Sequence, residues 1–178
     1  KYEAAQKATL FRTSTTYPSI SAPVACWLRA GERLAEEIAC GSWEPSEFQE
    51  SLNSLRELSR MKNPAGFLPK LKDTCAEHGV ALLLVPAPPK CRASGATFFL
   101  NGRKPVILMS GRYKNDEHFW FTFFHEVGHL ILHGDAPLFI EGGGVHGPRE
   151  IEANRFAERI LIPDEYHEEM LRLPVEHQ

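Results

Sequence analysis

The feature that most constrains this chain is an apolar segment, residues 118–133, that contains the pattern H-E-x-x-H as His125, Glu126 and His129. Phe, Trp, Val, Leu and Ile surround these polar residues on nearly every side, which predicts a buried helix rather than a solvated one. Positions i and i+4 of a helix share a face, so the two imidazoles point the same way. Buried His and Glu side chains need partners, and one metal ion would satisfy all three.

The residue types in this motif indicate a particular chemistry. Two neutral imidazoles and a carboxylate suit Zn²⁺ with one coordination position left open, and the Glu of the motif is placed to handle protons. Such a site hydrolyses amide bonds. Because His and Glu ligands also admit Mn²⁺ and Fe²⁺, the residues favour zinc without excluding these two metals.

A catalytic zinc site needs a third protein ligand, for which the sequence offers three candidates. Asp135 stands where a longer pattern, H-E-x-x-H-x-x-G-x-x-H, would place it, but position 132 is Leu and continues the helix. The favoured candidate is Glu150, in an amphipathic helix predicted over residues 148–163 between two prolines. Glu152 lies two positions further along and points elsewhere, so it is the weaker candidate.

The predicted second helix carries two further expectations. Asn154 lies one turn after Glu150, and we expect it to orient a metal ligand. We expect most of the apolar face of this helix to consist of four residues, Ile151, Phe156, Ile160 and Leu161.

Two separated stretches, HEVGHLILHG at 125–134 and EIEANRFAERILIP at 150–163, resemble the ImmA/IrrE metallopeptidase family. Its members combine an H-E-x-x-H helix with a later helix of the form E-x-x-A-N-x-F-A-x-x-L-L-M-P, whose final Met is Ile162 here. The resemblance covers roughly residues 65–165. It implies that His125, His129 and Glu150 bind zinc and that Glu126 is the general acid/base. It also implies a cytoplasmic regulatory protease that cleaves helix-turn-helix repressors.

Residues 22–29 and 112–124 resemble a narrower subgroup of this family. In that subgroup a repressor/antitoxin-type helix-turn-helix of the HigA-like kind precedes the peptidase domain. No such DNA-binding region is visible in this sequence, and the resemblance implies that the native protein has more chain before Lys1.

The composition narrows the class of protein further. A hydrophobic content of 43% supports a real core, while a net charge of −3 argues against a nucleic-acid surface in this fragment. The chain has no apolar run of membrane length and no signal peptide, which fits a cytoplasmic protein. None of the four cysteines forms a C-x-x-C pair, so Cys26, Cys40, Cys75 and Cys91 are expected to be free thiols.

The order of the predicted elements indicates an α+β fold that is mostly helical and zincin-like. Residues 1–21 are interpreted as a linker or the remnant of an upstream domain, 22–62 as an N-terminal helical segment and 63–178 as the metallopeptidase domain. A small sheet of three or more strands is expected to pack on the H-E-x-x-H helix. Helices are predicted over 23–40, 45–60 and 64–78, and strands over 80–85, 96–100 and 105–110, the last two joined at Asn101-Gly102.

Several parts of the site stay open at this level. The sheet edge beside the cleft is expected to hold an extended peptide by strand addition. The loop 134–147 contains three consecutive glycines and is interpreted either as a lid or as a plain connector. His133, one turn after His129, is interpreted as a core or surface histidine, and the alternative is a side chain that contacts and orients a metal ligand. Four residues are unranked candidates for stabilising an oxyanion: Tyr113, His118, His146 and Arg149.

Together these observations predict a zinc-dependent regulatory endopeptidase with a protein substrate, a DNA-binding repressor or antitoxin-type protein. The alternative is a non-proteolytic domain that senses a metal or another ligand for a transcriptional regulator. The intact Glu126 favours catalysis, because a metal site without catalytic activity has no chemical need for that carboxylate. We expect no direct nucleic-acid or membrane binding by this fragment, and the sequence makes no prediction about its oligomeric state.

Overall fold

The computed structural model describes residues 21–112, 115–134, 138–140 and 147–163, together with 166 and 172. The expected linker, residues 1–21, therefore lies outside the described residues except for Ser21. Within these residues the elements are, in chain order, α2 (Ala22–Glu37), α3 (Pro45–Glu57), the 3-10 turn η1 (Leu58–Arg60), α4 (Pro64–Glu77), β1 (Ala81–Leu84), β2 (Gly95–Leu100), β3 (Lys104–Met109), α5 (Asp116–Leu132), β4 (Leu138–Ile140) and α6 (Pro148–Leu161).

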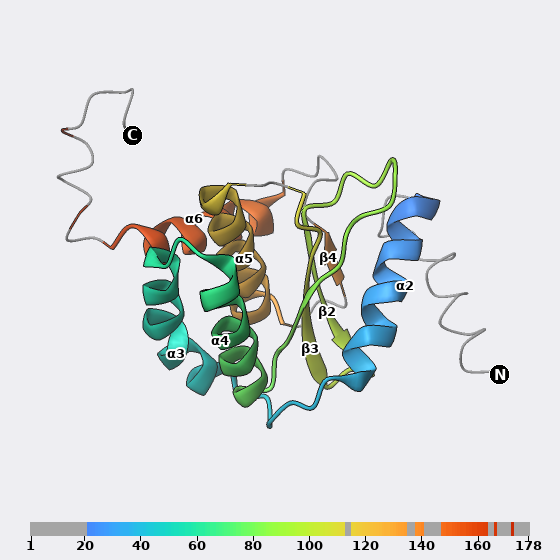
Figure 1. The fold of residues 1–178 in the computed structure, drawn as a ribbon, viewed down its shortest axis with the longest axis horizontal. Helices are drawn as coiled ribbons and strands as arrows, with labels where there is room; N and C mark the ends of the chain where they lie inside the picture. The colour runs from blue at the N-terminus through green and yellow to red at the C-terminus, as the bar shows by residue number, and fades with distance from the viewer. Residues whose placement is uncertain are drawn as a thin grey trace.

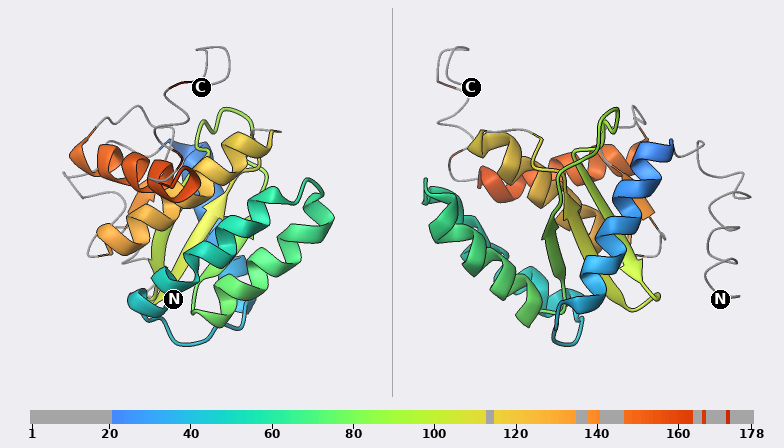
Figure 2. Two further views of the ribbon diagram at one scale, coloured as in Figure 1. Left: turned by 90° about the vertical axis from the view of Figure 1, so that its left-hand side faces the viewer. Right: turned by 45° about the vertical axis from the view of Figure 1, so that its right-hand side comes forward.

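A four-stranded mixed sheet with the order β1-β3-β2-β4 lies at the centre of the fold (Figure 1). β1 pairs with β3 in parallel, whereas β2 pairs antiparallel with both β3 and β4. Helix α2 covers one face of the sheet, and α4 and α5 cover the other, as the two views of Figure 2 also show. The predicted α+β class is confirmed, and the sheet has one strand more than the three predicted by residue range.

Alternating side chains of the strands divide the core into two layers. Along β3, Val106 and Leu108 pack towards α2, while Ile107 and Met109 pack towards α4 and α5. Because β3 is buried on both faces, its sequence is a continuous apolar run and does not alternate with polar residues. The same alternation directs Thr97 of β2 towards α5, where its hydroxyl contacts Glu126.

Helix α2 is fixed to the sheet by polar contacts near both of its ends. Near its start, the Trp27 indole N–H donates to the carbonyl of Val85 over 2.7 Å. At its end, Lys104 Nζ of β3 donates to the carbonyls of Ala35, at 2.7 Å, and Ile38. A cation at this end also interacts favourably with the helix dipole. The predicted N-terminal segment thus contributes to the core, and the domain boundary after residue 62 stays a prediction.

The predicted helices and the hairpin are confirmed, with small differences at their ends. The helix predicted over 23–40 ends at Glu37, and the one predicted over 45–60 changes to a 3-10 turn at Leu58. In the hairpin, Asn101 and Gly102 both have positive φ, 53° and 70°, as a tight turn between twisted strands requires. Strand β4 was not predicted, and it lies within the segment interpreted as a lid or connector.

No helix among the described residues is long and apolar enough to cross a membrane. All four cysteines fall within the described ranges and are free thiols, with Cys26 exposed, Cys40 half-buried, and Cys75 and Cys91 buried.

Candidate metal centre

Helix α5 places the H-E-x-x-H motif in the interior. The helix begins after Asn115, whose side-chain oxygen accepts from the backbone N–H of His118 over 3.3 Å and caps the first turn. Every residue from 122 to 130 is buried. The side chains of His125 and His129 are only 1% exposed and Glu126 is fully buried. The buried helix predicted from the apolar flanks is therefore confirmed.

Helix α6 lies directly against α5 (Figure 2), and small residues, Gly128 of α5 and Ala153 of α6, lie at the contact. A Cβ added to Gly128 would lie 3.2 Å from Cα of Ala153 and equally close to the Phe156 ring. Because Gly128 has no side chain, the two backbones approach more closely here than they could with a larger residue at this position. The close approach brings Glu150, in the first turn of α6, to the two imidazoles.

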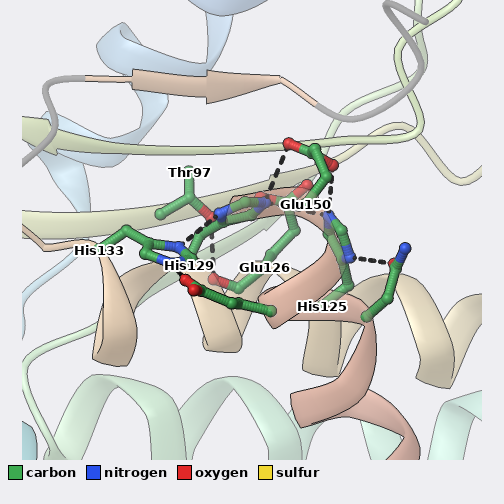
Figure 3. Close-up of polar contacts among 8 residues, drawn as sticks. Thr97, His125, Glu126, His129, His133 and Glu150 are labelled. Carbon is green, nitrogen blue, oxygen red and sulfur yellow. Dashed lines mark hydrogen bonds and ion pairs between the residues drawn. The ribbon is translucent and has the colours of Figure 1, made fainter. Parts of the chain in front are cut away.

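The atoms of His125, His129 and Glu150 converge on one point (Figure 3). The two Nε2 atoms lie 3.0 Å apart, and the Glu150 carboxylate lies 3.3 Å from Nε2 of His125 and 3.4 Å from Nε2 of His129. Ligand atoms at zinc distances of about 2.0–2.1 Å on a tetrahedron lie roughly 3.3 Å from one another. The spacing and the N₂O donor set therefore fit a divalent metal ion.

The surroundings of these residues favour the protonation states that a metal requires. Burial lowers the pKa of His129, and the neighbouring Glu150 offsets this only in part. For Glu150, burial raises the pKa, but hydrogen bonds from His125 and His129 and their charges outweigh it and lower the pKa to about 2. At neutral pH, His129 is consequently a neutral imidazole and Glu150 a carboxylate.

The outer nitrogens of both imidazoles also have partners, one from the middle of α6 and one from the C-terminal end of α5. Nδ1 of His125 lies 2.8 Å from the amide oxygen of Asn154, the contact expected of a residue that orients a ligand. Nδ1 of His129 lies 3.2 Å from Nδ1 of His133, whose Nε2 lies 2.7 Å from the carboxylate of Glu152. His133 is only 5% exposed, as a core histidine would be, and it also contacts His129 directly, which is the arrangement expected from the alternative reading.

The carboxylate of Glu126 is hydrogen-bonded by a residue of the sheet, unlike the histidine His125, whose partner lies on α6. The Thr97 hydroxyl donates to Oε2 of Glu126 over 2.5 Å and lies 3.2 Å from the Glu126 carbonyl oxygen (Figure 3). Two positions earlier on β2, Gly95 leaves the space in which this carboxylate lies. Neither residue was singled out from the sequence, because a Gly and a Thr in an apolar strand have no motif of their own.

Strand β4 lies across the same region. It pairs with β2 so that Phe139 stands opposite Thr97. The Phe139 ring stacks on His129, with ring centroids 4.1 Å apart and the planes 14° from parallel, and the Arg149 guanidinium lies 5.8 Å from the Phe139 ring centroid. The edge of β2 is thus paired with the chain's own β4, and peptide binding at a sheet edge stays a prediction.

The remaining sequence candidates lie in different places. Glu152 is not part of the three-residue cluster and instead contacts His133. His118 is exposed in the first turn of α5, with Nδ1 2.6 Å from the Asn115 side-chain oxygen. Three of the candidates fall outside the described residues: Asp135, Tyr113 and His146.

The expected apolar face of α6 needs one correction. Ile151 is 48% exposed, whereas Ala153 and Ala157 are the buried residues of the helix. The contact with Gly128 turns the alanine side of α6 towards α5, and Ile151 is thereby turned outwards. Phe156, Ile160 and Leu161 do pack against the core, as expected.

A comparison with known protein families matches residues 76–176 to the IrrE N-terminal-like domain, a peptidase family. The chain belongs to this ImmA/IrrE family. The matched region contains the whole sheet together with α5 and α6, so every residue of the cluster lies inside it. Family membership supports a metallopeptidase-type function, in agreement with a donor set that fits a divalent metal. A search of curated proteins finds no match.

Proposed function

We propose that this domain is a zinc-dependent endopeptidase in which His125, His129 and Glu150 hold the metal and Glu126 is the general acid/base. The observation that carries the proposal is the convergence of two imidazole Nε2 atoms and one carboxylate at spacings of 3.0–3.4 Å inside a buried site. Zinc suits this N₂O set best because it accepts four-coordinate geometry with an open position.

The chemistry divides between the metal and the side chains. When bound, zinc supplies a Lewis acid that polarises the scissile carbonyl and activates water. Glu126 takes a proton from the attacking water and passes it to the leaving amine nitrogen, so that the peptide bond is replaced by a carboxylate and an amine. Thr97 holds the Glu126 carboxylate in place during these transfers.

We further propose that the substrate is a DNA-binding protein of the helix-turn-helix repressor or antitoxin type. The resemblance of the two motif helices to regulatory members of the ImmA/IrrE family supports this substrate. The net charge of −3 also suits a domain that acts on a DNA-binding protein rather than on DNA itself.

Metal content measured by mass spectrometry on purified wild-type protein, Glu126→Gln and Glu150→Ala tests the metal site. After zinc is supplied, we expect about one zinc per chain in wild type and Glu126→Gln and a loss of zinc in Glu150→Ala. Wild-type protein that binds no zinc, or a Glu150→Ala variant that keeps it, would show that the ligand set is wrong.

Cleavage of a helix-turn-helix antitoxin, and of unfolded casein as a general substrate, tests the activity. Removing a general acid/base is expected to slow cleavage by about 10²–10⁴-fold, so Glu126→Gln should retain zinc and lose nearly all activity. If zinc-loaded wild-type protein cleaves neither substrate, the non-proteolytic sensor becomes the better explanation of the same metal site.

A further inference from the structure

The side chains described so far hold the metal or transfer a proton, and the oxygen of the scissile carbonyl still needs a partner. When water attacks a peptide bond, the electron pair of the C=O double bond moves onto this oxygen, and hydrogen-bond donors aimed at it speed the reaction. The Thr97 hydroxyl is close by, but its single proton is already donated to Oε2 of Glu126. The donor has to come from elsewhere in the site.

Arg149 is the oxyanion candidate that the described part of the structure places beside the metal centre. It directly precedes Glu150 in the first turn of α6. His118, by contrast, lies in the first turn of α5, seven residues before His125, which corresponds to about 10 Å along a helix. The other two candidates fall outside the described residues.

A stack of side chains holds the Arg149 guanidinium on the β4 side of the site. Its Cζ lies 5.8 Å from the centroid of the Phe139 ring, which is within the range of a cation–π interaction. The same ring stacks on His129 at a centroid distance of 4.1 Å, and Nε2 of His129 faces Glu150. Because Arg149 is exposed, a substrate that enters the site from solvent can reach the guanidinium.

The position of Arg149 in α6 is not one that helix stability favours. Arg149 follows Pro148, the first residue of the helix, so its cation lies at the positive end of the helix dipole. Acidic residues stabilise the first turn of a helix, whereas cations stabilise the last turn, where Arg159 lies. An arginine at this end therefore gives the helix no dipole stabilisation, and a role towards the substrate explains it better.

We propose that Arg149 is a catalytic residue that donates hydrogen bonds to the oxygen of the scissile carbonyl as this oxygen becomes negatively charged. The inference rests on the proposed peptidase function. A guanidinium has five N–H donors and remains protonated throughout the pH range of folded proteins, so Arg149 is always able to donate. Its fork of donors also suits an oxygen with several lone-pair directions.

The electrons and protons of the reaction can be followed through this arrangement. As the water oxygen bonds to the carbonyl carbon, the C=O electron pair moves to the oxygen that faces Arg149, and a water proton moves to Glu126. When the C–N bond breaks, the pair on the oxygen re-forms the C=O bond. The pair of the broken bond stays on the amine nitrogen, which takes the proton from Glu126.

Arg149→Ala and Arg149→Lys test this role, with Arg155→Ala as the matched control because Arg155 is an exposed arginine on the same helix. On zinc-loaded protein we would measure zinc content, kcat and KM for casein cleavage, and the dissociation constant of phosphoryl-Leu-Trp. The tetrahedral phosphoryl group of this dipeptide resembles the carbonyl carbon and oxygens after water attack. Urea unfolding of the metal-free variants shows whether the fold is intact.

We expect Arg149→Ala to retain zinc and wild-type stability and to lose about 10²–10³-fold in kcat, as on removal of one oxyanion donor elsewhere. KM should change little, and phosphoryl-Leu-Trp should bind more weakly. Arg149→Lys should lie between wild type and Arg149→Ala, because lysine retains the charge but not the fork of donors. Arg155→Ala should match wild type.

Three outcomes would overturn the proposal. Wild-type kcat and dipeptide affinity in Arg149→Ala would show that the guanidinium takes no part in the reaction. A raised KM with unchanged kcat would show that Arg149 binds substrate and transition state equally. Loss of zinc in Arg149→Ala would show that the residue supports the metal centre instead.

The same measurements separate this inference from the proposed function. If zinc-loaded wild-type protein neither cleaves casein nor binds phosphoryl-Leu-Trp, the peptidase function itself is wrong, and the role of Arg149 is wrong with it. If wild-type protein does both and Arg149→Ala does both equally well, the peptidase function stands and the assignment of Arg149 alone is wrong.

Discussion

The hydroxyl of Thr97 donates to Oε2 of Glu126 over 2.5 Å, so that a strand and a helix meet at the residue proposed to transfer protons. The contact is buried, and Gly95 on the same strand lies against the other side of the carboxylate. A Cβ at position 95 would lie only 2.8 Å from Cδ of Glu126. The sheet thus determines both the position and the orientation of this carboxylate.

We expect Thr97→Val to slow peptide cleavage without loss of zinc. The variant preserves shape but removes one hydrogen bond to a charged group, which is worth about 1.5–3 kcal/mol, or roughly 10–100-fold in rate if it is needed in the transition state. Thr97→Ser retains the hydroxyl and should keep most of the activity. Steady-state cleavage rates measured together with zinc content check this, and equal rates in the Val and Ser variants would contradict it.

The contact between α5 and α6 predicts opposite effects of the same substitution at two helical glycines. In Gly128→Ala the new methyl group meets the backbone of Ala153 at 3.2 Å, and overpacking of this kind costs about 1–3 kcal/mol. In Gly66→Ala it meets only the flexible end of Met61 at 3.1 Å, and the better helix former should stabilise the chain by up to about 1 kcal/mol. Urea unfolding of the two variants measures this.

Zinc affinity adds a second check on the same pair of variants. Separation of the helices should also weaken zinc binding in Gly128→Ala and leave it unchanged in Gly66→Ala. Equal stability and equal zinc affinity in both variants would mean that the approach of α6 is not limited by residue 128.

Two depressed pKa values predict that the metal-free domain is sensitive to acid. The pKa of His129 lies below its ordinary value of 6.5, and that of Glu150, at about 2, lies below 4.5. The unfolded chain therefore binds more protons at both positions, and the free energy of unfolding falls as the pH drops. The contribution of His129 is lost from about pH 6.5 downwards, and that of Glu150 between about 4.5 and 2.

Urea unfolding of chelator-treated protein at pH 7.5, 5.5, 4 and 3 is the measurement. Glu150→Gln should flatten the decrease below pH 4.5 because it removes the group that titrates there. An unfolding free energy that stays constant over the whole range in wild type would show that these groups are not perturbed as described.

The cysteines are expected to react in the order of their exposure. Cys26 is exposed, whereas Cys75 is fully buried and its burial raises the pKa of its thiol, which removes the reactive thiolate. Burial also raises the pKa of Cys40, but this side chain is only half-buried. At pH 8 we expect alkylation of Cys26 first and of Cys40 more slowly, with Cys75 and Cys91 labelled only after unfolding. Peptide mass mapping over time checks the order, and labelling of native Cys75 as fast as Cys26 would contradict it.

Local patterns explain why much of the fold was predictable. The apolar flanks of His125 predicted a buried helix, and Asn101-Gly102 predicted the hairpin because few other pairs tolerate two positive φ angles. The convergence of Glu150 with the histidines was expected from the two motif helices, and the structure places these residues together. Their role as ligands stays a prediction.

Features that depend on packing between distant elements were not predictable. Strand β4 has only three residues, Leu138–Ile140, too few to show a periodic pattern, and it exists through its pairing with β2 about 40 positions away. The exposure of Ile151 follows from how closely α6 approaches Gly128, which no spacing within α6 encodes. The partners of His133 likewise depend on where the end of α5 meets α6.

The pairing of β4 with β2 determines where a peptide can add to the sheet of this domain. A peptide that added to the outer side of β4 would lie one strand spacing, about 4.8 Å, further from Thr97 than one paired directly with β2. A peptide that pairs with β2 must instead replace three residues of the chain itself, including Phe139 opposite Thr97. Binding along β2 is then an exchange of one strand for another. Its equilibrium is set by the difference in stability between two ladders rather than by the affinity of a vacant edge.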